Sequence, residues 1–142
     1  MLKAIALSFP LMCLALPLNA QNGTVSQFGG ASIACYYMII SMDHDDALDC
    51  GQPFDAEHEA NYQTIHTAME DYIRTYAGPN GDAILAALKR SASHKAGTPR
   101  EDVCEKFAAR RNSAGLLTSA ETVAKLQDLL KTTPNPMAGG CL

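Results

Sequence analysis

The first twenty residues indicate which part of this chain forms the mature domain and in which compartment that domain folds. Lys3 supplies a positive charge, the residues from there to Leu18 are almost all apolar, and the small residue Ala20 precedes Gln21. This order is typical of a secretory signal peptide. Because the apolar run is shorter than the roughly 20 residues that span a bilayer, we expect residues 1–20 to be cleaved and the mature chain to lack a membrane span.

Export to the periplasm or the cell exterior would place the cysteines in an oxidising compartment. Cys13 lies in the predicted signal peptide, and the mature chain keeps Cys35, Cys50, Cys104 and Cys141. An even number in an exported chain favours two disulfide bonds, although four cysteines allow three pairings. We prefer a bond between Cys35 and Cys141, because it fastens the end of the chain to the core. Cys50 then pairs with Cys104, and the main competing set is Cys35–Cys50 with Cys104–Cys141.

Charge is unevenly distributed along the mature chain, which is short enough for one domain. Residues 21–80 hold nine acidic side chains and one basic side chain, whereas residues 81–142 hold nine basic and six acidic ones. The net charge is negative, and this excludes the dense basic footprint that nucleic-acid binding needs. We expect the two halves to attract each other within the fold. The alternative is an acidic face that attracts a basic partner.

Hydrophobic periodicity and capping signals predict about five helices and no strand. Asp55 is placed as an N-cap ahead of a long apolar stripe, and Thr98 and Thr118 each begin a capping box. Gly78 and Gly97 are positioned to end two of the helices. The predicted helices cover residues 31–42, 55–77 and 80–96, and two more begin at residues 98 and 118.

The segment 31–42 is apolar on every side, so periodicity alone allows a buried helix or a buried strand. We favour the helix, because the segment exceeds ten residues and every later element is helical. Residues 43–53 are expected to form an acidic loop. The predicted fold is all-α: a compact bundle held by two disulfides, in which a flexible leader (21–30) precedes a single helical domain (31–142) with a C-terminal tail from about residue 132.

An Asp/His cluster is the candidate metal site. Asp43, His44 and Asp45, with His58 further along, supply ligand types that divalent ions use. Their spacing does not fit a calcium-binding loop, and no zinc motif is present. We therefore expect a solvated loop without a cofactor, and keep a divalent-metal-binding protein as the alternative.

Acid–base catalysis has one candidate pair, His66 and Glu70, which stand four residues apart on the predicted helix 55–77. A hydrolase that uses this pair is a third hypothesis. The sequence contains no nucleophile motif, no nucleotide-binding loop and no unpaired mature cysteine if both disulfides form. Catalysis is therefore not the expected role.

Binding is the function that we expect by elimination. The mature chain fits a small periplasmic or secreted, non-enzymatic protein, such as an inhibitor, an immunity protein or an accessory factor that acts on a basic extracytoplasmic protein. Tyrosines and acids favour such a surface, because tyrosine is enriched at interfaces and acids attract basic partners. The alternative is that most of these tyrosines belong to the core. The candidate surface residues are Tyr62, Tyr72, Tyr76, Asp46 and Asp49.

Overall fold

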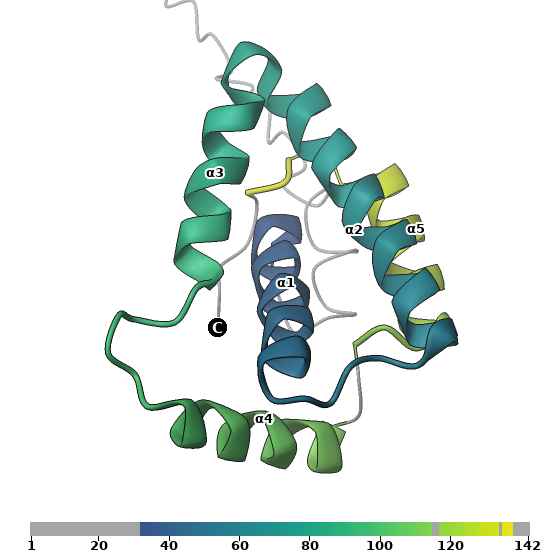
Figure 1. The fold of residues 1–142 in the computed structure, drawn as a ribbon. Coiled ribbons are helices and arrows are strands. Elements are labelled where there is room, and N and C mark those ends of the chain that lie inside the picture. The colour runs from purple at the N-terminus through teal and green to yellow at the C-terminus, as the bar shows by residue number, and fades with distance from the viewer. Residues whose placement is uncertain (1–31, 115–116, 134, 138–142) are drawn as a thin grey trace, which may run out of the picture.

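The structure is a computed structural model that describes residues 32–114, 117–133 and 135–137 (Figure 1). Within these ranges the chain forms helices and no strand, so the prediction of an all-α fold is confirmed for the part described. The helices are α1 (Ile33–Asp49), α2 (Ala56–Ala77), the short 3₁₀ helix η2 (Gly78–Asn80), α3 (Gly81–Ala92), α4 (Arg100–Ala114) and α5 (Ala120–Thr132). None of these helices is long and apolar enough to cross a membrane. The predicted signal peptide and leader lie outside the described residues.

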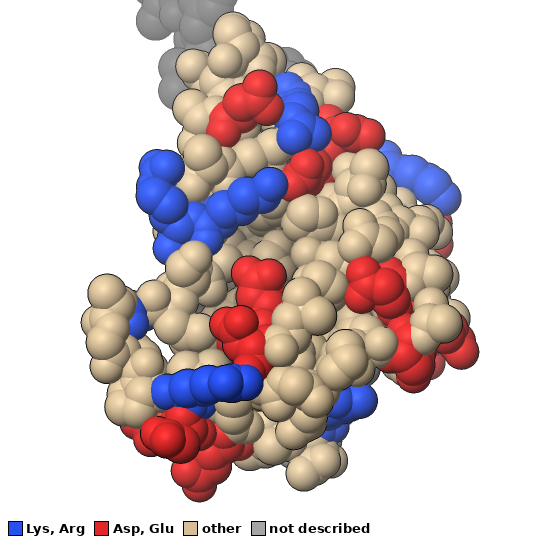
Figure 2. Space-filling model, in the orientation of Figure 1, with Lys and Arg blue, Asp and Glu red and all other residues tan. Residues whose placement is uncertain are grey.

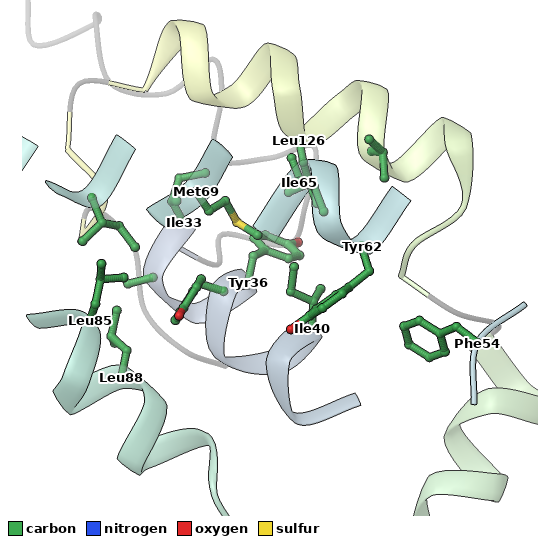
Figure 3. Close-up of a cluster of buried hydrophobic side chains, with 14 of the residues drawn as sticks. Ile33, Tyr36, Ile40, Phe54, Tyr62, Ile65, Met69, Leu85, Leu88 and Leu126 are labelled. Atoms are coloured by element: carbon green, nitrogen blue, oxygen red, sulfur yellow. The ribbon is translucent and has the colours of Figure 1, made fainter. Parts of the chain in front are cut away.

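Helix α1 lies in the middle of the molecule and packs against α2, α3 and α4, while α5 covers the other side of α2 (Figure 1). The first half of α1 is buried on almost every side, which explains its run of apolar residues. A central helix was therefore the correct choice over a buried strand. Its side chains join those of the other helices in one hydrophobic core (Figure 3). The largest fully buried members are Tyr37, Phe107, Ile33, Ile40, Ile65, Met69, Ile73 and Leu126.

The acidic loop predicted at residues 43–53 is wrong for its first half, because α1 continues to Asp49. Asp43 and Asp46 return to the inner face of the helix one turn apart, where Arg110 of α4 neutralises them. The chain leaves the helix only after the C-cap Cys50 and turns at Gly51, whose φ of 66° favours glycine.

The other helix boundaries follow the capping signals with three shifts. Helix α4 begins at Arg100, and the hydroxyl of Thr98, the predicted cap, donates to the carbonyl of Lys95. The carboxylate of Asp55 accepts a hydrogen bond from the backbone N–H of His58, as expected for the N-cap of α2. The N-cap of α5 is Ser119, one residue after the predicted Thr118. The helix predicted over residues 80–96 ends earlier, at Ala92. His94 therefore lies in the loop before α4 and not on α3.

Cys50 and Cys104 form a disulfide bond that joins the end of α1 to α4. This bond confirms one of the preferred pairings and excludes the competing set. Cys35 is also a disulfide cysteine, but Cys141 lies outside the described residues, so the bond between these two stays a prediction. The chain after α5 returns to the core before it reaches Cys141: the carbonyl of Pro136 accepts a hydrogen bond from Ala34 at 3.0 Å.

Candidate functional site

A buried charge network holds the second half of α1 against α4 and the loop after α3. Arg110 donates from Nη2 to Asp43 Oδ1 at 2.7 Å and to Asp46 Oδ2 at 3.0 Å. His94 Nε2 lies 2.5 Å from Asp46 Oδ1. Burial raises the pKa of Asp43, and the guanidinium of Arg110 opposes this shift. Acids of the first half of the chain and bases of the second half therefore do pair internally, as expected, and Asp46 (1% exposed) is part of the core.

An adjacent side of the same helical turns faces solvent. Asp45, with 72% of its side chain exposed, Leu48 (54% exposed) and Asp49 form what we call the outer strip of α1. Asp45 and Asp49 are one turn apart, so their carboxylates are neighbours on the helix surface. Figure 2 shows acidic side chains in the middle of this face, between basic side chains above and below. The helix thus separates two buried acids from two exposed ones within seven residues.

Two surface hollows border the outer strip. The α1–α3 hollow has a volume of about 290 Å³, and the α1–α4 hollow has a volume of about 490 Å³. The polar and aromatic residues that line the first are Ser41, Asp45, Tyr62, His66, Lys89 and Ser93. The second is lined by Leu48, Asp49, His94, Thr98, Arg100 and Val103. One carboxylate of the outer strip therefore reaches each hollow.

Aromatic rings form one wall of the α1–α3 hollow. The ring centroids of Tyr62 and His66 are 5.0 Å apart, and the ring of His44 stacks on Tyr62 with centroids 4.0 Å apart. Burial, with the nearby charges of Asp45 and Glu59, raises the pKa of Tyr62 to about 12. Burial lowers the pKa of His66 below its ordinary value of 6.5. Both rings that line this hollow are therefore uncharged at neutral pH.

Glu70 anchors the basic side of the same hollow. Lys89 Nζ lies 3.0 Å from Glu70 Oε1, Tyr37 donates to the same oxygen at 2.8 Å, and Arg74 donates to Oε2 at 3.0 Å. Burial alone would raise the pKa of Glu70, but these hydrogen bonds lower it to about 2. His66 Nδ1 and Glu70 Oε1 are 3.8 Å apart, so the predicted pair does come together. Its carboxylate, however, serves as an ion-pair partner, which adds no support to acid–base catalysis.

Three of the four candidate metal ligands bind side chains outside the candidate set, and the fourth, Asp45, lies 3.9 Å from His44 Nδ1. Asp43 binds Arg110, and His44 Nε2 lies 3.0 Å from Glu59 Oε2. His58 Nδ1 lies 2.9 Å from Asp55, while Asp45 faces solvent. Across residues 32–114, 117–133 and 135–137, no three His, Cys, Asp or Glu side chains are grouped in a way that could hold a metal ion. The geometry therefore adds no support to the divalent-metal alternative.

The candidate surface residues do not form one surface. Tyr62 and Asp46 are buried, and the partly buried Tyr72 donates its hydroxyl hydrogen to the carbonyl of Thr133. Tyr76 and Asp49 are exposed, but Tyr76 lies at the end of α2 and Asp49 at the end of α1. The buried position of Asp46 moves the candidate acidic surface to its exposed neighbour Asp45.

Sequence reasoning missed His94, Lys89 and Arg110, which complete the charge network and the rim of the α1–α3 hollow. One available signal was the i, i+3 spacing of Asp43 and Asp46, because two acids on the inner face of an apolar helix need buried partners. The resulting arrangement can bind a charged or amphipathic group on a rigid face. No protein-family model, no curated protein and no solved structure matches this chain.

Proposed function

We propose that this chain is a small exported, non-enzymatic binding protein that acts on a basic extracytoplasmic protein, as an inhibitor, an immunity protein or an accessory factor. The observation that carries the proposal is the outer strip of α1, where Asp45, Leu48 and Asp49 are exposed at the rims of two hollows. The Cys50–Cys104 bond is compatible with export, because disulfides persist in oxidising compartments.

The charge of the outer strip is available to a partner. Lys89, at the rim of the α1–α3 hollow, already pairs with Glu70 at 3.0 Å. Arg100, at the rim of the α1–α4 hollow, donates to the neutral backbone carbonyl of Asp49 and keeps its positive charge, so Asp45 is the less compensated of the two carboxylates. The carboxylates of Asp45 and Asp49 point away from the internal network of Arg110. A basic segment that reaches this face therefore meets two carboxylates with an exposed leucine between them.

Rigidity favours binding at this face. The Cys50–Cys104 bond and the contacts of Arg110 hold the last two turns of α1 from the inner side. A surface that is ordered before it meets its partner loses less conformational entropy on association. Acidic groups at the rim also raise the rate of encounter with a basic partner, and salt screens this effect.

Capture from extracytoplasmic extract tests the proposal. The oxidised mature chain serves as bait at low and at high salt, beside two doubly substituted chains of equal net charge. D45N/D49N removes the carboxylates of the outer strip, whereas D71N/D128N removes two exposed carboxylates from α2 and α5. A basic protein should be captured at low salt by the wild type and by D71N/D128N, and lost with D45N/D49N.

The outcomes separate a local surface from a general charge effect. Equal loss in both double variants would mean that net charge alone attracts the captured protein, which contradicts docking at the outer strip. Failure of the wild type to capture any protein at low salt would contradict the proposal as a whole.

A further inference from the structure

The α1–α3 hollow combines an exposed carboxylate with a neutral aromatic wall. Asp45 lines the hollow from α1. The rings of Tyr62 and His66, which are four residues apart, line it from α2. The volume of about 290 Å³ lies just below the range of about 300–1,000 Å³ for small-molecule pockets. The hollow therefore suits one long side chain better than a whole ligand of drug size.

The charge that lacks a close counter-ion in this hollow is negative. Lys89 on the opposite side is held by Glu70 at 3.0 Å. The one basic atom within ion-pair distance of Asp45 among the described residues is His44 Nδ1, at 3.9 Å, and His44 Nε2 is already 3.0 Å from Glu59. A ligand that fills the hollow is therefore expected to bring a positive charge to Asp45.

Arginine fits these two features better than lysine does. A guanidinium is planar, binds a carboxylate through two parallel hydrogen bonds and stacks on aromatic faces. His44 stacks on one face of Tyr62, which is 7% exposed, so the guanidinium would lie against the parts of the Tyr62 and His66 rings that line the hollow. Lysine supplies the charge but neither the plane nor the two-pronged geometry.

We propose that the α1–α3 hollow is an anchor pocket that takes one arginine side chain of the basic partner, with the guanidinium paired to Asp45 and lying against Tyr62 and His66. This inference rests on the proposed function and assigns the residue by which the partner is recognised. Such a buried aromatic and charged anchor is typical of the few positions that dominate binding energy at interfaces.

Short peptides test the pocket without knowledge of the partner. The probes are three acetylated and amidated tripeptides, Gly-Arg-Gly, Gly-Lys-Gly and Gly-citrulline-Gly, and citrulline keeps the shape of arginine without its charge. Each is titrated into the oxidised mature chain while the ring signals of Tyr62 and His66 are followed by NMR. The arginine peptide should bind and shift both ring signals, whereas the lysine and citrulline peptides should bind about tenfold more weakly.

Asp45→Asn and Asp49→Asn provide matched variants, because they make the same charge change one helical turn apart on the same strip. D45N should lower the affinity for the arginine peptide by about tenfold, the loss expected for one charge-assisted pair. D49N should leave its affinity within about twofold, the range expected for a rim charge that makes no contact.

Three results would overturn the pocket: no binding of the arginine peptide, equal binding of the three peptides, or equal weakening by D45N and D49N. The two proposals fail separately. Capture of a basic protein that depends on the outer strip, without arginine-peptide binding, would remove only the anchor pocket. Binding of the peptide at Asp45 without capture of any protein would remove the partner and leave a site for an arginine-bearing ligand.

Discussion

Arg110→Met tests whether the buried charge network holds α4 to α1. The substitution keeps much of the aliphatic bulk and leaves Asp43 and Asp46 without their guanidinium, while His94 still contacts Asp46. Breaking a buried ion pair by removal of one partner costs about 3–5 kcal/mol. Because 39% of the Arg110 side chain is exposed and water can reach the gap, we expect a loss of about 3 kcal/mol in the free energy of unfolding.

Urea denaturation of the oxidised mature chain at pH 7 measures this loss. Arg111→Met is the matched control. Among the described residues, the Arg111 side chain makes an exposed hydrogen bond of 3.4 Å to the carbonyl of Gln52, so the substitution should cost less than about 0.5 kcal/mol. Adding Asp43→Asn and Asp46→Asn to R110M should recover part of the loss, since no unpaired charge then stays buried.

The loss should also depend on pH. Without Arg110, burial keeps the pKa of Asp43 above its ordinary value with no opposing guanidinium, so the folded state binds protons more readily than the unfolded state. The variant is therefore penalised most at neutral pH, and its deficit should shrink as the pH falls through the range where Asp43 protonates. If R110M were no less stable than R111M at pH 7, the contacts of Arg110 would not stabilise the packing of α4 on α1.

Three further changes probe other parts of the fold. C50S/C104S opens a loop of 54 residues and should lower the free energy of unfolding by about 4 kcal/mol, measured by urea denaturation against the oxidised chain. Gly81→Ala should cost about 1–3 kcal/mol in the same assay, because the new Cβ would lie 2.7 Å from Arg74 Cα; no loss would mean that α3 shifts freely. Hydrogen bonds lower the pKa of Glu70 to about 2 in spite of burial, so its contribution to the free energy of unfolding should be complete above about pH 4.5. That contribution should fall by about 3 kcal/mol as the pH drops towards 2, and E70Q should remove this pH dependence.

The candidate site was only partly predictable from the sequence. Asp46 and Asp49, in the acidic loop predicted at residues 43–53, were expected at the surface for a basic partner, and of the two Asp49 is exposed. The prediction that Asp46 is a surface residue was wrong, because Asp46 is buried. It assumed a loop at these residues, and a loop has no regular pattern of inward and outward side chains. Once α1 is known to continue to Asp49, a period of 3.6 residues turns Asp45 about 100° away from Asp46 and so accounts for the exposure of Asp45. Asp49 has the same i, i+3 relation to Asp46 as Asp43 has, and its exposure at the last residue of the helix does not follow from the period. The two hollows were not predictable in this way, because their lining includes Lys89 near the end of α3 and His94 in the loop that follows it.

Local signals in the sequence determined where most helices begin, because a cap needs residues three or four positions apart. Asp55 and the capping pattern near Ser119 are of this kind. For the apolar segment after residue 31 the local pattern allowed a helix or a strand, and its length and the helical neighbours favoured the helix that the structure shows. Tertiary structure alone decided which acids are buried. Asp46 takes its partners from His94, 48 residues away, and from Arg110, 64 residues away. A carboxylate can be buried only where oppositely charged or hydrogen-bonding groups compensate it, and a local sequence pattern does not specify partners that are distant in the chain.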